Sequence, residues 1–221
     1  MSDRVKPDRE SVLRQVTEQD IKFVRLWFVD ILGNLKGFAI KVEDLQDALD
    51  QGVGFDGAAI EGFARYFEND MRAFPDPTTF VVLPWRPREN AVARMFCDIR
   101  VPQGTAFQGD PRYILKRNLR RLEELELTYN VGAELEFFYL RNADNPEFLD
   151  RSGYFDQLSH QPATDLRRDS VLYLEDMNIV TKYSHHEAAQ SQHEIDLAYD
   201  DALITADNII TAKLVIKELA Q

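Results

Sequence analysis

The first half of the chain alternates short apolar runs with turn residues. Apolar side chains recur at helical spacing in residues 9–18 and again, over a shorter stretch, in 43–50. Two runs rich in β-branched and aromatic residues, 21–31 and 35–42, are separated by Gly33-Asn34, which predicts a hairpin. Further elements are expected as a glycine-rich loop at 52–57 and strands at 79–83 and 91–99. This mixture predicts a small α+β unit.

A turn-rich segment, residues 101–104, ends this unit and predicts two domains, 1–104 and 105–221. Pro111 then precedes a strongly amphipathic pattern over 112–125, which is typical of a helix. Beyond it we expect a strand at 130–140, an irregular stretch at 141–162, a helix at 165–177, a strand at 179–183 and a long helix at 198–220.

Composition narrows the possible partners and the cellular setting. The 221 residues are 44% hydrophobic and 11% aromatic, as expected for a folded globular chain, and no apolar run reaches the ~18 residues of a membrane span. A formal net charge of −12 disfavours nucleic acid as the main partner. The single Cys97 and the polar N-terminus favour a reduced, cytoplasmic setting without a membrane partner. The surplus of acidic residues fits either a solvated surface or carboxylates that converge on Mg²⁺ or Mn²⁺.

One pair of carboxylates lies within an apolar strand pattern. Glu134 and Glu136 are two residues apart, so on a strand both side chains point to the same face. Two ionised carboxylates on a half-buried strand repel each other and lose solvation, and a divalent cation would relieve both penalties. The alternative is an exposed strand face on which the pair meets water.

A second cluster combines histidines with carboxylates. The segments 184–187 (Ser-His-His-Glu) and 192–195 (Gln-His-Glu-Ile) include Glu187 and Glu194, which lie seven residues apart. This spacing fits two helical turns or two strand positions joined by a loop. The cluster lacks the histidine spacing of H-E-x-x-H zinc sites, so a carboxylate-rich Mg²⁺ or Mn²⁺ site fits better. Buried structural histidines beside surface acids are the alternative.

The four glutamates together suit a site that holds more than one divalent ion and a polyphosphate. The sequence contains neither G-x-x-x-x-G-K-[ST] nor G-x-G-x-x-G, which disfavours a P-loop or Rossmann nucleotide site.

These motifs resemble those of the glutamine synthetase family, at the spacing of the bacterial class I α-type enzymes. In chain order, the matching segments are Phe28-Val29-Asp30-Ile31-Leu32-Gly33-Asn34-Leu35-Lys36, Phe55-Asp56-Gly57-Ala58-Ala59-Ile60-Glu61-Gly62-Phe63, Asp70-Met71 with Pro75-Asp76-Pro77, Glu134-Leu135-Glu136-Phe137-Phe138, Arg167-Arg168-Asp169, and Ser184-His185-His186-Glu187 with Gln192-His193-Glu194-Ile195. The resemblance implies a β-grasp-like N-terminal domain followed by the first part of a catalytic domain.

The resemblance also implies roles for individual residues. Glu136, Glu187 and Glu194 correspond to ligands of the metal that binds the substrate glutamate and the activated intermediate. Glu134 corresponds to a ligand of a second Mg²⁺ or Mn²⁺, which holds the ATP phosphates. Asp56 corresponds to an aspartate that a neighbouring subunit donates to the ammonium pocket, although Asp-Gly is also a common turn.

Further implications concern the nucleotide and the assembly. His185 and His186 are expected near phosphate and metal-bound oxygens, and Lys182 near the nucleotide. The implied substrates are glutamate, ammonium and ATP, and the parent family forms homo-oligomers built as dodecameric rings.

Three departures from the family pattern bear on activity. Ala58-Ala59 removes two loop hydroxyls, Lys182 replaces a common glutamate, and Ala189-Gln190-Ser191 replaces the usual A-P-G. The family's later metal, phosphate and glutamate ligands are expected beyond Gln221. We therefore expect part of an ATP-dependent ligase that forms glutamine through a γ-glutamyl phosphate. The alternatives are a γ-glutamyl ligase acting on an organic amine, and an inactive member with a binding or assembly role.

Overall fold

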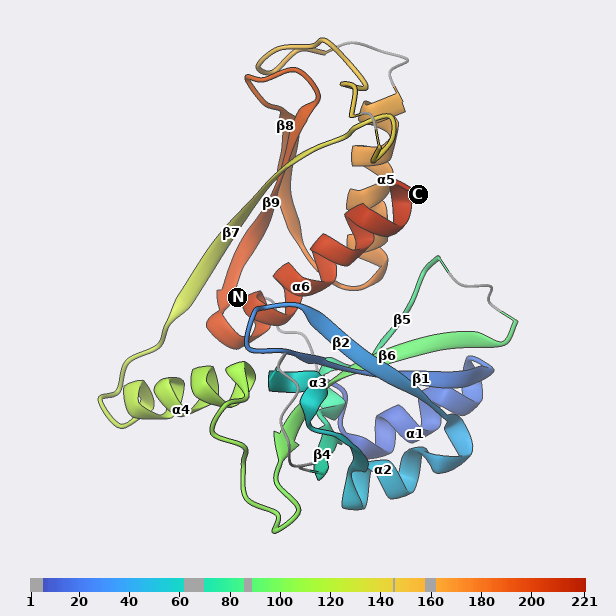
Figure 1. The fold of residues 1–221 in the computed structure, drawn as a ribbon, viewed down its shortest axis with the longest axis vertical. Helices are drawn as coiled ribbons and strands as arrows, with labels where there is room; N and C mark the ends of the chain where they lie inside the picture. The colour runs from blue at the N-terminus through green and yellow to red at the C-terminus, as the bar shows by residue number, and fades with distance from the viewer. Residues whose placement is uncertain (1–5, 62–69, 86–88, 145, 158–161) are drawn as a thin grey trace. The chain divides into compact units, whose positions relative to one another are not determined.

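The computed structural model describes residues 6–61, 70–85, 89–144, 146–157 and 162–221 (Figure 1). The chain divides into two compact units, Met1–Thr128 and Tyr129–Gln221, each with its own sheet. Two residues of the predicted motifs, Gly62 and Phe63, lie outside the described residues. The mixture of helices and sheets confirms the α+β class that the sequence predicted.

The first unit contains a six-stranded sheet in the order β2-β1-β6-β4-β3, with β5 paired to β6. Its central strands β1 and β6 run parallel, and the other pairs run antiparallel. The described elements are α1 (Arg9–Glu18), β1 (Ile21–Val29), β2 (Leu35–Lys41), η1 (Val42–Asp44), α2 (Leu45–Gln51), β3 (Val53–Asp56), α3 (Ala58–Glu61), β4 (Asp70–Pro75), η2 (Pro77–Thr79), β5 (Val81–Val82), β6 (Ala91–Arg100) and α4 (Pro111–Glu123).

Helix α1 and the central strands bury the apolar core of this unit. Val12 of α1, Val24 and Leu26 of β1, and Met95 of β6 are each fully buried in one cluster. Burying side chains of this size contributes about 1.5–3 kcal/mol each. These core residues are apolar positions of the helical and strand patterns in the sequence.

The predicted hairpin is present, and a buried aspartate closes it. β1 pairs antiparallel with β2, and Asp30 follows the last residue of β1. The Asp30 Oδ1 atom accepts from the backbone N–H groups of Leu32 at 2.9 Å and Asn34 at 2.8 Å. The carboxylate therefore satisfies turn amides that no strand partner reaches.

The glycine-rich stretch 52–57, predicted as a loop, is instead mostly strand. Residues Val53–Asp56 form β3, which pairs antiparallel with β4 at the edge of the sheet. Only Gly52 needs glycine's conformational freedom, because its φ is +67° and the ring of Phe74 lies against its Cα. A partner strand that is distant in sequence thus overrides the local turn signal.

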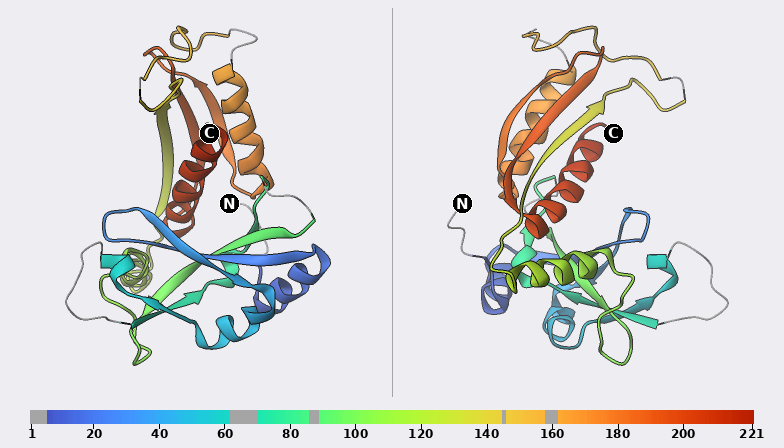
Figure 2. Two further views of the ribbon diagram at one scale, coloured as in Figure 1. Left: turned by 45° about the vertical axis from the view of Figure 1, so that its right-hand side comes forward. Right: turned by 90° about the vertical axis from the view of Figure 1, so that its left-hand side faces the viewer.

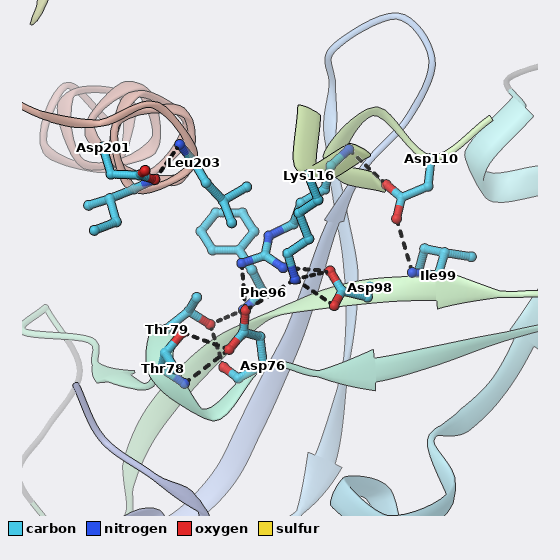
Figure 3. A network of polar contacts seen from close by, with 12 residues as sticks. Asp76, Thr78, Thr79, Phe96, Asp98, Ile99, Asp110, Lys116, Asp201 and Leu203 are labelled. Atoms are coloured by element: carbon cyan, nitrogen blue, oxygen red, sulfur yellow. Dashed lines mark hydrogen bonds and ion pairs between the residues drawn. The ribbon is translucent and has the colours of Figure 1, made fainter. Parts of the chain in front are cut away.

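A charged network attaches α4 to the sheet of the first unit (Figure 3). The buried Arg112 donates to Asp76 at 2.8 Å and to Asp98 at 2.5 Å, and Lys116 contacts Asp98 at 2.6 Å. Burial raises the pKa of Asp76, but Arg112, Thr78 and Lys116 more than offset that effect, so its pKa lies below the ordinary value. Asp110 caps the helix by accepting from the Arg112 backbone N–H at 3.0 Å.

The second unit is a three-stranded antiparallel sheet in the order β7-β9-β8, with two helices packed against one face (Figure 2). Its elements are β7 (Asn130–Phe138), α5 (Pro162–Asp176), β8 (Thr181–His186), β9 (Gln192–Asp201) and α6 (Ala202–Leu219). Buried apolar residues from α5, β9 and α6, including Leu174, Ile195 and Val215, fill the space between helices and sheet.

The long helix was predicted to start too early. Residues 198–201 complete β9, and α6 begins at Ala202. Asp201 marks the change, because its Oδ1 accepts from the backbone N–H of Leu203 at 2.9 Å. Aspartate is a preferred N-cap residue, so the sequence itself contained a signal for a helix that begins at Ala202.

Candidate divalent-metal site

The register of the three strands brings the predicted carboxylates onto one face of the sheet. On β9, Glu194 lies between Glu136 of β7 and His185 of β8. Two residues along, Asp196 lies opposite Glu134. Because strand side chains alternate, all five side chains share the face opposite the one that α5 and α6 cover.

The spacing of Glu187 and Glu194 is explained by a hairpin between β8 and β9. The Glu187 backbone N–H donates to the Gln192 carbonyl at 2.8 Å, so both ends of the connection are paired. Of the two geometries that the seven-residue spacing allowed, the structure has the hairpin, with Glu187 directly after β8 and Glu194 on β9. One Glu187 oxygen accepts from the backbone N–H of Ala188 at 2.9 Å, and the other lies 2.9 Å from His185 Nε2.

The electrostatics of this face are those of crowded acids. Burial, together with the neighbouring carboxylates of Asp196 and Glu187, raises the pKa of Glu194 to about 8. Hydrogen bonds from the Ala188 backbone and from Glu194, with burial opposing them, hold the pKa of Glu187 below its ordinary value. Glu194 therefore keeps its proton beside the ionised Glu187, and a divalent cation bound between the two carboxylates would replace that proton.

Two buried polar atoms on this face have no partner among the described residues. They are Asp196 Oδ1 and His185 Nδ1. Unpaired buried polar atoms are uncommon in folded proteins. Mg²⁺ and Mn²⁺ prefer oxygen ligands, which Asp196 and the neighbouring glutamates supply on this face. The donor set therefore fits a hard divalent cation.

Two three-residue groups have ligand atoms within 4.8 Å of one another on this face. They are His185, Glu187 and Glu194, and Glu134, Glu194 and Asp196. Glu194 belongs to both groups. Glu136 accepts from Gln192 Nε2 at 2.6 Å. The predicted glutamates thus lie together, although Glu134 and Glu136 are exposed whereas Glu194 is 7% exposed.

Asp196 was missed by the sequence reasoning. Its signal is the same period-two rule that linked Glu134 with Glu136, because Asp196 follows Glu194 by two residues. The rule required a strand there, and no strand was predicted over β9.

His186 lies on the opposite face of the sheet from His185. Its Nε2 is 2.7 Å from Asp150 Oδ1, and both side chains are almost fully buried. Asp150 also contacts His193, whose Nδ1 is 2.7 Å from Arg167 of α5. The role predicted for His186 beside substrate phosphate stays a prediction, and its direct contacts are with this buried network.

Lys182 shares the second unit with the carboxylate cluster, whereas Asp56 belongs to the first unit. Lys182 is exposed on β8, with its Nζ 5.6 Å from the ring centroid of Tyr183. Asp56 ends β3 in the first unit and accepts from the Ala58 backbone N–H at 2.9 Å, so it does form the turn considered as the alternative. It also lines a shallow cavity of about 420 Å³ together with Asp70 and Arg72.

Fold and site together define an α+β protein whose second sheet presents a carboxylate cluster suited to divalent cations. Residues 20–102 match the family model described as glutamine synthetase, beta-Grasp domain, and residues 108–221 match glutamine synthetase, catalytic domain. The chain therefore belongs to the glutamine synthetase family, and the family that the sequence motifs predicted is confirmed. The β-grasp domain and partial catalytic domain are confirmed with it, whereas the exact boundary at residue 104 stays a prediction.

Curated relatives support the same family. The glutamine synthetase of Mycolicibacterium smegmatis is 49% identical over 218 residues, which are 96% of this chain and 49% of the relative. That of Methanosarcina mazei is 47% identical over 216 residues, covering 96% of this chain and 48% of the relative. The chain thus spans about half the length of the curated relatives it matches.

Solved structures share the fold. A structure titled as a GmaS/ADP complex superposes with a TM-score of 0.84 at 27% identity, covering 94% of this chain and 48% of that one. The cryo-EM structure of Plasmodium falciparum glutamine synthetase has a TM-score of 0.82 at 22% identity and covers 100% of this chain and 50% of its own, so it supports the fold alone. Within the described residues, no helix combines the length and apolar character that a membrane crossing requires.

Proposed function

We propose that this chain is the N-terminal part of an ATP-dependent ligase that joins glutamate and ammonia into glutamine through a γ-glutamyl phosphate. The observation that carries the proposal is the carboxylate face of the β7–β9 sheet, which the family's catalytic-domain model covers. Hard oxygen ligands arranged in this way suit the Mg²⁺ or Mn²⁺ that accompanies a polyphosphate.

The four glutamates would divide between two cations. Glu136, Glu187 and Glu194 would hold the cation near the glutamate substrate, and Glu134 would hold the cation near the ATP phosphates. Bound there, the cations would supply charge neutralisation and Lewis-acid polarisation of the reacting oxygens. Asp196, opposite Glu134 and two residues from Glu194, adds a third carboxylate to this part of the face.

Asp56 would act on the ammonium. One of its oxygens accepts from the Ala58 backbone, so the exposed carboxylate is held in a fixed orientation. A carboxylate so placed stabilises NH₄⁺ and favours its deprotonation as the nucleophile forms. In the oligomeric ring that we propose for the full-length protein, a neighbouring subunit would receive this group.

The cation site is tested first, in the 221-residue chain. We expect Mn²⁺ to bind in a calorimetric titration, and Glu187→Ala to weaken that binding at least tenfold, because it removes a ligand and the hydrogen-bond partner of His185. Glu175→Ala, which removes an exposed carboxylate from α5, is the matched control and should leave the Kd unchanged. Equal affinities for the chain and both variants would contradict a site on this face.

The reaction is tested on the complete product of the gene. We expect phosphate release from ATP to require glutamate together with ammonium, and Asp56→Asn to lower kcat with ammonium at least tenfold. Release that requires a primary alkylamine in place of ammonium would instead favour the organic-amine ligase, which the two alanines Ala58 and Ala59 motivate. No release with either acceptor would favour a binding or assembly role.

A further inference from the structure

One buried carboxylate connects the two halves of the β8–β9 hairpin. Asp150 is 6% exposed, and its two oxygens bind different histidines: Oδ1 lies 2.7 Å from His186 Nε2 and Oδ2 lies 3.1 Å from His193 Nε2. His186 immediately precedes Glu187, and His193 immediately precedes Glu194. The same aspartate thus holds the neighbour of each of two carboxylates that point to the other face of the sheet.

The partners of the rings determine which atoms donate. Arg167 can only donate, so His193 Nδ1 accepts its hydrogen bond at 2.7 Å and His193 Nε2 carries the proton that Asp150 accepts. His186 Nδ1 lies 2.6 Å from the carbonyl oxygen of Glu187, so this ring also binds the backbone of the residue whose position matters. The hydrogen bonds of this network therefore hold the two rings in defined orientations.

This donor pattern also shows what the group is not. Asp150, His186 and His193 have ligand atoms close enough to hold a cation. A cation on His193 Nε2 would displace its proton while Arg167 occupies Nδ1, which would leave an imidazolate. The group is satisfied by hydrogen bonds instead.

Asp150 is itself held by Ser191, in the connection between β8 and β9, and by the Ser152 backbone. The Ser191 hydroxyl oxygen accepts from the backbone N–H groups of Leu149 at 2.7 Å and Asp150 at 3.1 Å, and it donates to the Tyr139 carbonyl at 2.8 Å. The Ser152 backbone N–H donates to Asp150 Oδ1 at 3.0 Å. The segment that carries Asp150 is thus attached to the end of β7 and to the start of β9.

We propose that Asp150 is a positioning residue that sets the separation of Glu187 and Glu194 by binding His186 and His193 behind them. The inference rests on the proposed function, since it concerns the cation that those glutamates would hold. Strands transmit such a constraint directly, because neighbouring residues on one strand share a backbone while their side chains face opposite sides. Groups that hydrogen-bond directly to metal ligands change metal affinity by about 10–100-fold in other sites. Asp150 acts one residue further out, so we expect an effect at the lower end of that range.

The test compares Mn²⁺ affinity with stability in the 221-residue chain. Asp150→Asn preserves shape but leaves one of the two histidines without a full acceptor, so we expect the Kd for Mn²⁺ to rise about tenfold. Leu174→Ala removes buried volume from the same unit but none of the hydrogen-bonding groups of the network, and should lower the urea midpoint while leaving the Kd within about twofold. If Asp150 affected only stability, the Kd of Asp150→Asn for Mn²⁺ would change no more than that of Leu174→Ala at an equal loss of stability. That result would overturn the proposal.

A second measurement needs no variant. Long-range ¹H–¹⁵N spectra of the unmodified chain should show His193 protonated at Nε2 and not at Nδ1, and the opposite pattern would overturn the proposal even if Asp150→Asn failed to fold. If the unmodified chain binds Mn²⁺ and Asp150→Asn binds it equally well, the positioning role alone is wrong. If the unmodified chain binds no Mn²⁺, the cation site proposed for this face is wrong and this inference falls with it, whereas the ligase reaction is still tested on the complete product of the gene.

Discussion

At the residue scale, Ser191 combines an unfavourable backbone with a favourable side chain. Its φ is +61°, in the left-handed region where a non-glycine residue loses about 1–2 kcal/mol. The buried hydroxyl makes three hydrogen bonds with backbone groups, which offset that loss. The departure from the family's A-P-G turn is thus explained, because serine replaces glycine's conformational freedom with contacts to residues 139 and 149–150.

Two substitutions at this position separate the contributions. Ser191→Ala retains the strained backbone and leaves two buried N–H groups unpaired, so we expect it to lower the free energy of unfolding by about 2–3 kcal/mol. Ser191→Gly loses the same bonds but relieves the strain, so its loss should be smaller by about 1 kcal/mol. Urea unfolding measures both, and a glycine variant less stable than the alanine variant would contradict this account.

The raised pKa of Glu194 predicts how stability depends on pH when no divalent cation is present. Its pKa of about 8 lies above that of an unfolded glutamate, so the contribution is fully present below the unfolded pKa and is lost as pH rises through 8. With EDTA present, the urea midpoint of the second unit should therefore fall between pH 5.5 and pH 9. Glu194→Gln, which cannot ionise, should show a smaller fall, and equal falls in both proteins would argue against a protonated Glu194.

At the element scale, α4 depends on charged contacts as well as apolar ones. Ile114 on this helix is 39% exposed, whereas Arg112 is buried between Asp76 and Asp98. Replacing Arg112 with methionine would leave two partly buried carboxylates with Lys116 as their cationic partner, and Asp76 would keep its hydrogen bonds from Thr78.

We expect Arg112→Met to lower the free energy of unfolding of the first unit by about 3 kcal/mol, as for a broken buried ion pair. Lys116→Met is the matched control and should lose about 1 kcal/mol or less, because Lys116 is more exposed and Arg112 remains in place. Thermal unfolding of each variant, monitored by hydrogen exchange in β1 and β6, would measure both losses of stability. Equal losses would show that the two cations share the carboxylates evenly.

Secondary structure was predictable where the signal is local. The β1–β2 hairpin has its turn residues between two apolar runs, and α1 has its cap and its apolar face within ten residues. Strand β3 and the first part of 198–220 were misread, because their conformation depends on partner strands far away in sequence. The turn signal of Gly52–Gly57 and the helical periodicity after 198 are real, but tertiary pairing overrides them.

At the scale of the whole molecule, the two units should respond differently to a cation. The carboxylate face belongs to the second unit, so Mn²⁺ at 100 times its Kd should stabilise that unit by about 2.7 kcal/mol. We expect hydrogen exchange to slow in β7, β8 and β9 but not in β1 or β6. Addition of EDTA should reverse the change, and equal slowing in both sheets would contradict a site confined to the second.

The sequence by itself determined the family and the α+β class, and it singled out the four glutamates as candidate ligands, because each of these rests on residue order or on the two-residue period of a strand. It could not determine that Glu194 lies between Glu136 and His185, or that Asp196 joins them, because strand register follows from pairing and not from spacing. It also placed His185 and His186 together, whereas the pleat sends them to opposite faces. Asp150 emerged only in the structure, since 36 residues separate it from His186 and only folding makes them neighbours.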